Sequence, residues 1–196
     1  MALFVELFVV STAPGFFILW FVYHVLSAGR REATLPILLT FLLGCAVVVP
    51  AALIEGIAVP HIQNIVAGTI PRALAIAFCV VAPTEELSRF LALVPDLRRP
   101  NSISTSRDGV MYGVAAAMGF ATAENILFVM ELGFTAGLFR AFLSVPVHGI
   151  CGAAIGYALG VGAKRREGRV CITLAGLGAA MLFHGIFDGI LLIQAG

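Results

Sequence analysis

The chain has 196 residues, of which 60% are hydrophobic and only 12% are charged, and its mean hydropathy is +1.04. A soluble domain usually carries about 25% charged residues, because its solvated surface must be polar, so this composition excludes an ordinary soluble globule. The net charge of +1 excludes the basic field of a nucleic-acid-binding protein, and partners are expected in or beside the lipid bilayer.

Six apolar stretches of ~20 residues or more follow one another with short polar connections, which is typical of a polytopic helical membrane protein. The sequence therefore predicts an all-α transmembrane bundle that forms one integral membrane domain over residues 1–196. Segment 60–70 fits a loop, an interfacial turn or an early start of the third span. The predicted spans are 3–26, 36–59, 71–94, 108–131, 139–163 and 171–195.

Positively charged residues outside the spans fall mainly on one side. Only Arg72 and Arg140 lie on the other side, both at the start of a span. Cytoplasmic loops of membrane proteins carry an excess of Lys and Arg, so the pattern predicts a cell-membrane protein with both termini outside the cytoplasm. The nine residues on the predicted cytoplasmic side are Arg30, Arg31, Arg98, Arg99, Arg107, Lys164, Arg165, Arg166 and Arg169.

Small residues at four-residue spacing predict where helices approach closely. The fourth span carries Gly109, Gly113, Ala117 and Ala121, and the fifth carries Gly152, Gly156 and Gly160. Packing of the bundle explains these residues, and they indicate no chemistry. The four cysteines have no metal-type spacing and are interpreted as packing residues.

Ionisable residues inside the spans are the informative ones. A charged side chain near the middle of a bilayer costs at least ~2.5–3.5 kcal/mol, so such residues normally face a protein interior or a watery cavity. Glu55 alone is interpreted as a residue that forms an interhelical hydrogen bond. The set within the spans is Glu55, Glu85, Glu86, Arg89, Glu124, His148, His184 and Asp188.

The helical rise of about 1.5 Å per residue places these side chains at overlapping depths in spans three to six. Two imidazoles and four carboxylates are therefore expected in one cavity between those spans. His184 and Asp188 are four residues apart and share a helix face. Arg89 follows Glu85 by four residues and Glu86 by three, which predicts an ion pair that leaves one carboxylate free as a base or ligand. Pro83 is expected to kink the third span.

Two chemistries fit such a cavity, and both end in hydrolysis. In one, a divalent metal, most readily Zn²⁺, is held by side chains drawn from Glu86, Glu124, His148 and His184, and it activates water. In the other, a buried Glu activates water without a metal. A non-proteolytic scaffold, or a small transporter with a buried Glu/His relay, is the alternative class.

Four ordered segments of the chain resemble the PrsW family of intramembrane proteases. They are Glu85-Glu86-Leu-Ser-Arg89, Gly119-Phe120-Ala121-Thr-Ala-Glu124-Asn125, His148 within Pro-Val-His-Gly, and His184-Gly-Ile-Phe-Asp188. The lead-in from Asp108 to Gly113 is also typical of this family, and the resemblance covers residues ~80–195. Residues 1–70 add only membrane spans.

The resemblance implies an intramembrane endopeptidase that cuts membrane-anchored proteins, such as an anti-sigma factor. It implies that Glu85 or Glu86 activates water and that Glu124 and His148 are partners in the site. His184 and Asp188 would hold a metal or the oxyanion. The chain departs from the family at three positions: Arg89 replaces a common Lys, Phe128 a common aromatic hydroxyl, and Asp188 a common Asn.

Overall fold

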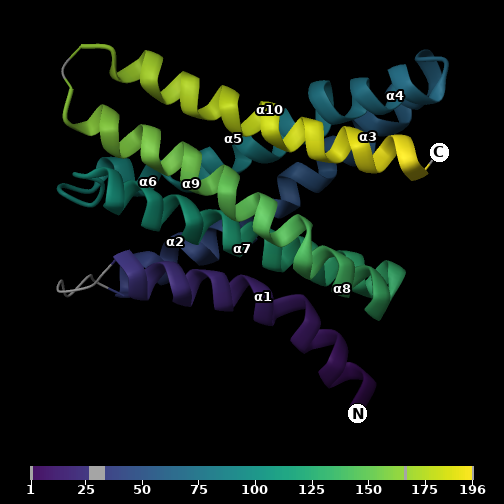
Figure 1. Cartoon of the computed structure of the whole chain (residues 1–196), viewed down its shortest axis with the longest axis horizontal. Coiled ribbons are helices and arrows are strands. Elements are labelled where there is room, and N and C mark those ends of the chain that lie inside the picture. Colours follow the sequence, from purple (N-terminus) through teal and green to yellow (C-terminus); the bar gives the residue numbers. More distant parts are fainter. Residues whose placement is uncertain (1, 27–33, 166, 196) are drawn as a thin grey trace.

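The computed structural model describes residues 2–26, 34–165 and 167–195, and every regular element in these ranges is a helix (Figure 1). This confirms the predicted helical membrane bundle. The elements are α1 (Ala2–Leu26), α2 (Thr34–Ala46), α3 (Val48–Ile65), α4 (Thr69–Ile76), η1 (Ala77–Val81), α5 (Ala82–Ala92), α6 (Val94–Arg98), α7 (Ser106–Leu132), α8 (Phe134–Phe142), α9 (Ser144–Ala163) and α10 (Arg169–Ala195).

Within the described ranges, five helical stretches are long and apolar enough to cross a membrane. They are Val5–Leu26, Thr34–Ile65, Ser106–Leu132, Phe134–Ala163 and Arg169–Gln194. The second continues as helix to Ile65, so most of segment 60–70 extends α3, and α4 begins at Thr69. The predicted third span corresponds to α4, η1 and α5 in succession, which carry four charged residues.

A π-helical turn interrupts this third stretch where Pro83 was expected to kink it. In η1 the Ala82 N–H bonds to the Ala77 carbonyl, five residues earlier. Pro83 has no N–H to give to the carbonyl of Cys79, so the regular i to i−4 ladder cannot pass through this point. Such a turn rotates the following residues around the helix axis, and Glu85, Glu86 and Arg89 of α5 come directly after it.

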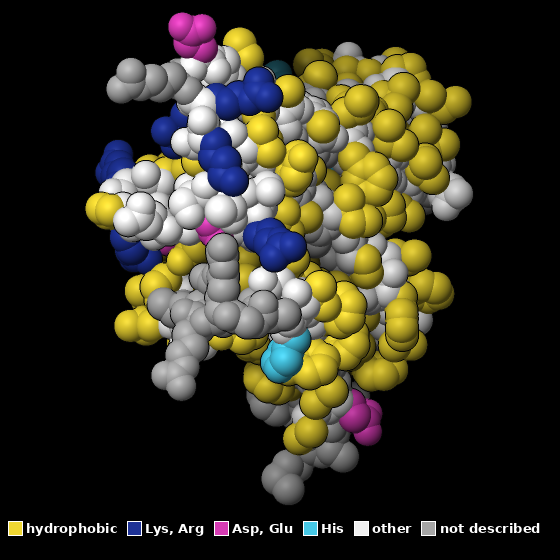
Figure 2. Space-filling model, turned by 60° about the vertical axis from the view of Figure 1, so that its left-hand side comes forward, with side chains coloured by type: hydrophobic (Ala, Val, Ile, Leu, Met, Phe, Trp, Pro, Cys, Tyr) yellow, Lys and Arg dark blue, Asp and Glu magenta, His cyan; other side chains and the backbone are white. Residues whose placement is uncertain are grey.

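The charged connections gather at one end of the bundle. The α6–α7 and α9–α10 connections lie at that end, and α10 finishes at the other, where α1 begins (Figure 1). Lys and Arg side chains cluster around these connections, while apolar atoms cover the flank of the bundle (Figure 2). From the sequence, most Lys and Arg residues were likewise expected on one side. Arg98, Arg99, Arg107, Lys164, Arg165 and Arg169 are exposed, whereas Arg30, Arg31 and Arg166 lie outside the described residues.

Glycines bring α7 and α9 into backbone contact, as the small-residue spacing predicted. A Cβ at Gly113 would overlap the carbonyl oxygen of Gly152, and a Cβ at Gly156 would overlap that of Gly109. The helix α7 thereby becomes the buried centre of the bundle, and α2 packs on another side of it through Gly119, where a Cβ would overlap the Phe41 carbonyl. These contacts fix α9 against α7 and so determine where His148 lies relative to Glu124.

A side chain of α7 also holds α1 in place. Pro14 lacks the N–H that would bond to the carbonyl of Val10, and the buried Asn125 fills that role from the neighbouring helix. Asn125 Nδ2 donates to Val10 O at 3.2 Å and to Ser11 O at 3.4 Å. The residue next to Glu124 is therefore anchored to the N-terminal helix.

Candidate active site

The predicted site residues come together from four helices, α5, α7, α9 and α10. Glu85, Glu86, Arg89, His148 and His184 are each at most 3% exposed. Glu124 and Asp188 are less enclosed, with side chains 15% and 19% exposed. The structure thus brings the predicted residues into one cluster, in which each buried polar group has a charged or imidazole neighbour.

Arg89 lies at the centre of the cluster and contacts both adjacent carboxylates. Its Nη2 is 2.5 Å from Glu86 Oε1 and 3.3 Å from Glu85 Oε2. Its Nη1 is 2.6 Å from Nδ1 of His148, and its guanidinium lies 4.9 Å from the centre of the Phe120 ring. The expected ion pair is present, and the guanidinium interacts more closely with Glu86 than with Glu85.

Each histidine contacts a different carboxylate through one ring nitrogen. His184 Nδ1 is 2.8 Å from Glu86 Oε1, and His148 Nε2 is 3.0 Å from Glu124 Oε2. An ionised carboxylate only accepts hydrogen bonds, so His148 Nε2 donates to Glu124. His184 Nδ1 also lies 3.1 Å from Arg89 Nη2, and its shorter contact is the one with Glu86. Carboxylates that hold a ring N–H in this way are the usual partners of metal-binding histidines, because they fix the orientation and tautomer of the ring.

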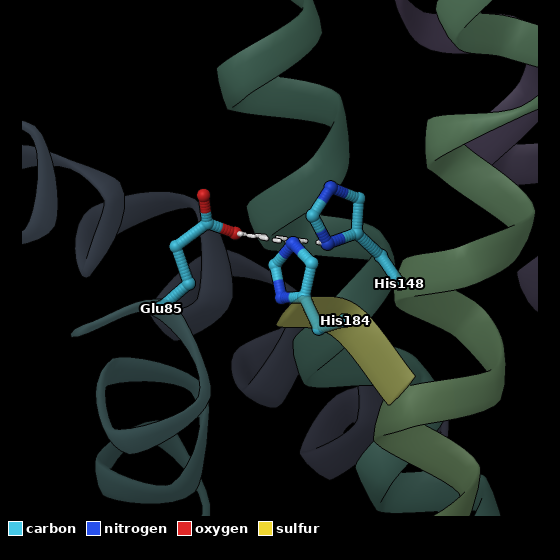
Figure 3. Close-up of side chains that lie close together, drawn as sticks. All are labelled: Glu85, His148 and His184. Carbon is cyan, nitrogen blue, oxygen red and sulfur yellow. Dashed lines mark ion pairs between the residues drawn. The ribbon is translucent and has the colours of Figure 1, made fainter. Parts of the chain in front are cut away.

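The other nitrogen of each ring points toward Glu85. His148 Nδ1 and His184 Nε2 both lie 3.8 Å from the same oxygen, Glu85 Oε2 (Figure 3). An arginine cannot give up its proton, so the contact with Arg89 means that His148 Nδ1 is an acceptor with a lone pair. When the proton of His184 is on Nδ1 alone, Nε2 is the nitrogen that presents a lone pair. Two imidazole nitrogens and one carboxylate oxygen therefore converge.

This convergence fits a divalent metal. One atom each from Glu85, His148 and His184 lie within 4.8 Å of one another. Two histidines and one glutamate are a donor set that Zn²⁺ uses in hydrolytic enzymes, with a further position open for water or substrate. Arg89 Nη1 would have to release His148 Nδ1 for a metal to bind there, since one lone pair cannot serve two cations. Its bond to Glu86 can persist.

Asp188 borders the same point. Its Oδ2 lies 3.1 Å from His184 Nε2, the nitrogen that faces Glu85. An unprotonated ring nitrogen and an ionised carboxylate oxygen both present lone pairs, so a contact this short requires a proton or a cation between them. The predicted sharing of a helix face by His184 and Asp188 is present.

The cluster opens into a cavity of about 320 Å³. Spans three to six were expected to surround it, and α3 contributes as well, through Glu55 and Val59. A second hollow of about 170 Å³ shares Glu55, Glu85, Glu124 and Phe128 with the first. Glu86 and Arg89 are absent from the lining of both hollows, which assigns them to the supporting side of the cluster. The polar lining residues of the larger cavity are Glu55, Glu85, Glu124, Arg140, Ser144, His148, His184 and Asp188.

Two residues of this cavity, Glu55 and Arg140, were not predicted from the sequence as part of the site. Glu55 was interpreted as an interhelical hydrogen-bonding residue, yet its Oε1 is buried without a hydrogen-bond partner among the described residues. Arg140 was interpreted only as a charge at the start of a span, yet its Nη2 lies 2.6 Å from Glu124 Oε2. Arg140 could have been suspected because a cation so close to an apolar span needs a partner, and Glu124 is a nearby acid on the adjacent span.

Comparison with known proteins identifies the family. Residues 32–196 match the family described as PrsW family intramembrane metalloprotease. The chain is 29% identical over 201 residues to the protease PrsW of Clostridioides difficile, covering 96% of this chain and 80% of that protein. It is 28% identical over 189 residues to the protease PrsW of Shouchella clausii, covering 95% of this chain and 84% of that protein.

A third relative, the protease PrsW of Bacillus subtilis, is 28% identical over 183 residues, covering 91% of this chain and 79% of that protein. No solved structure matches the chain. The match over most of the chain favours the endopeptidase over the scaffold or transporter that the residues alone left open. The chain belongs to the PrsW family of intramembrane metalloproteases, and it is an intramembrane endopeptidase.

Proposed function

We propose that the chain hydrolyses peptide bonds of membrane-anchored proteins at a single metal centre held by Glu85, His148 and His184. The observation that carries this proposal is the convergence of two ring nitrogens, His148 Nδ1 and His184 Nε2, on one oxygen of Glu85, each at 3.8 Å. Bound there, a divalent ion such as Zn²⁺ supplies Lewis-acid chemistry: it makes water nucleophilic near neutral pH and polarises a peptide carbonyl.

The remaining carboxylates of the cluster have supporting roles in this proposal. Glu86 accepts the Nδ1 proton of His184, and Glu124 accepts the Nε2 proton of His148, so each ring presents its other nitrogen to Glu85. Arg89 keeps Glu86 ionised and in place. The ligand set thus includes Glu85, in place of Glu86 and Glu124 from the set expected from the sequence.

Asp188 is proposed to carry the proton. Its Oδ2 is beside the reacting centre and its side chain is partly open to the cavity. It takes a proton from water as the water oxygen bonds to the peptide carbonyl carbon. It then gives that proton to the amide nitrogen as the carbon–nitrogen bond breaks, which leaves one carboxylic acid and one amine.

The lining of the cavity suits a substrate segment that comes from the membrane. The rest of its lining is apolar and consists of Val59, Ile76, Val81, Phe128, Leu191 and Leu192. Such a wall suits an unwound apolar segment, while the polar residues supply hydrogen bonds that hydrocarbon cannot. We infer that the substrate is a membrane-anchored protein such as an anti-sigma factor.

From the distribution of Lys and Arg, we also infer that both termini of the protease lie outside the cytoplasm.

The test uses the purified full-length protein in detergent with a panel of membrane-anchored peptides. A chelator should abolish cleavage and Zn²⁺ should restore it. Glu85→Gln, His148→Ala and His184→Ala should each lower turnover at least ~100-fold. His24→Ala and His61→Ala, which remove histidines outside the cluster, should cleave like the wild type. Cleavage that survives both the chelator and the three substitutions would overturn the proposal.

A further inference from the structure

We infer that Arg140 is a positioning residue of the reaction, acting on His148 through Glu124. This inference rests on the proposed function, because it assigns Arg140 to the support of a proposed metal ligand. Arg140 lies on α8, the short helix that precedes α9, whereas Glu124 lies on α7. The side chain of Arg140 is only 17% exposed, although from the sequence this residue was expected at the start of an apolar span.

The geometry places Glu124 between two donors. Arg140 Nη2 approaches Glu124 Oε2 to 2.6 Å, and His148 Nε2 approaches the same oxygen to 3.0 Å. Arg140 and His148 come from consecutive helices, so α8 and α9 each contribute one donor to the same carboxylate of α7. A single oxygen that accepts from both groups is held in a fixed position, and the ring of His148 is held with it.

Phe128 explains why the guanidinium stays there. It follows Glu124 by four residues, so both side chains lie on one face of α7. The guanidinium carbon of Arg140 lies 3.8 Å from the centre of the Phe128 ring, which is a close cation–π contact. The face of the Phe128 ring therefore supports the arginine that pairs with Glu124.

The ion pair with Arg140 also balances the charge of Glu124. Glu85 and Glu55 line the same cavity as Glu124, so an unpaired Glu124 carboxylate would face two further acids in a poorly hydrated space. Arg140 compensates that charge. Without it, Glu124 would be free to turn away from His148, and the Nδ1 nitrogen of the ring would lose its orientation toward Glu85.

The experiment measures Zn²⁺ affinity, by competition with a coloured chelator, together with turnover and thermal stability. Arg140→Leu should weaken Zn²⁺ binding and lower kcat, each by about 10–100-fold. Arg140→Lys should recover part of both, since it keeps the charge but loses the planar stack on Phe128. Arg72→Leu is the matched control and should leave Zn²⁺ binding and kcat unchanged. Like Arg140, Arg72 was predicted at the start of a span, but its Nε donates to the Val66 carbonyl.

A double-mutant cycle separates positioning from packing. If Arg140 acts through Glu124, then Glu124→Gln with Arg140→Leu should bind Zn²⁺ no more than about twofold more weakly than Glu124→Gln alone. Wild-type Zn²⁺ affinity and kcat in Arg140→Leu would overturn the inference and leave the proposed function intact. Additive losses in the double variant would overturn it as well. A wild-type protein that neither binds Zn²⁺ nor cleaves would overturn the proposed function, and the inference with it.

Discussion

Nδ1 of His184 and Oε1 of Glu86 lie 2.8 Å apart across α10 and α5, 98 positions apart in the chain. The same carboxylate oxygen is the closest acidic partner of Arg89. Glu86 thus joins a cation and an imidazole at the base of the cavity without lining the cavity itself. The relationship separates two adjacent glutamates by role: Glu85 faces the cavity, and Glu86 supports the residues that surround it.

Replacing Glu86 with Gln should therefore affect both stability and activity. The substitution leaves the buried guanidinium of Arg89 without its shortest partner, and breaking a buried pair typically costs about 3–5 kcal/mol. The free energy of unfolding in detergent and the Zn²⁺ affinity should both fall. Glu167→Gln, in the exposed α9–α10 connection, is the control. Stability of Glu86→Gln equal to that of the control would contradict the role given to Glu86.

The contact between α7 and α9 should be intolerant of a single methyl group. A Cβ at Gly113 meets backbone atoms of α9, which cannot yield as a side chain can, so Gly113→Ala should destabilise the protein by about 1–3 kcal/mol. It should also displace His148 from Glu124 and lower turnover. Gly178→Ala on α10 is the matched substitution, because its Cβ would meet nothing within 4 Å. Comparable thermal melting of the two variants would refute this explanation.

Asn125 and Pro14 should be energetically coupled. Asn125→Leu removes the donor that satisfies the Val10 carbonyl, at a cost of about 1–3 kcal/mol. In a Pro14→Ala background the N–H of residue 14 can bond to that carbonyl within α1, so the cost of Asn125→Leu should shrink. The measurement is a double-mutant cycle on unfolding free energies. Strict additivity would show that the amide of Asn125 does not compensate for the proline.

Asp96, which lies outside the predicted membrane spans, should make the stability of the protein depend on pH. Burial raises the pKa of Asp96 from its ordinary value of 3.8, although hydrogen bonding from Thr40 at 2.6 Å and the charge of Arg99 oppose this. The folded protein therefore holds the proton more tightly than the unfolded chain. This contribution to stability is present at low pH and is lost as pH rises from 3.8 through the raised folded-state pKa.

Asp96→Asn removes that titration. Thermal melting at a series of pH values should show the variant gaining stability relative to the wild type as pH rises through this window. Thr40→Val should steepen the wild-type trend, since it removes a donor to the ionised carboxylate. A difference between Asp96→Asn and wild type that stays constant with pH would contradict the assignment.

The helical bundle and the clustering of ionisable residues were predictable from the sequence, because hydrocarbon penalises isolated charges strongly and small residues must meet where helices touch. The division of labour between Glu85 and Glu86 was not predictable. Both follow Pro83 within three residues, and the π-turn of η1 that precedes them changes the helix rotation on which any prediction of the face toward the cavity depends. Arg140 also escaped prediction, because α8 is a separate short helix that returns its guanidinium to α7.

The most direct test of the central claim is the X-ray absorption spectrum of the Zn²⁺-loaded protein. If Glu85, His148 and His184 hold the metal, the wild-type spectrum should show nitrogen and oxygen neighbours at about 2.0–2.1 Å, with scattering from two imidazole rings. His148→Ala and His184→Ala should each lose one ring, and Glu85→Gln should retain both with weaker binding. Two imidazoles that persist in either histidine variant would place the metal elsewhere and contradict the account.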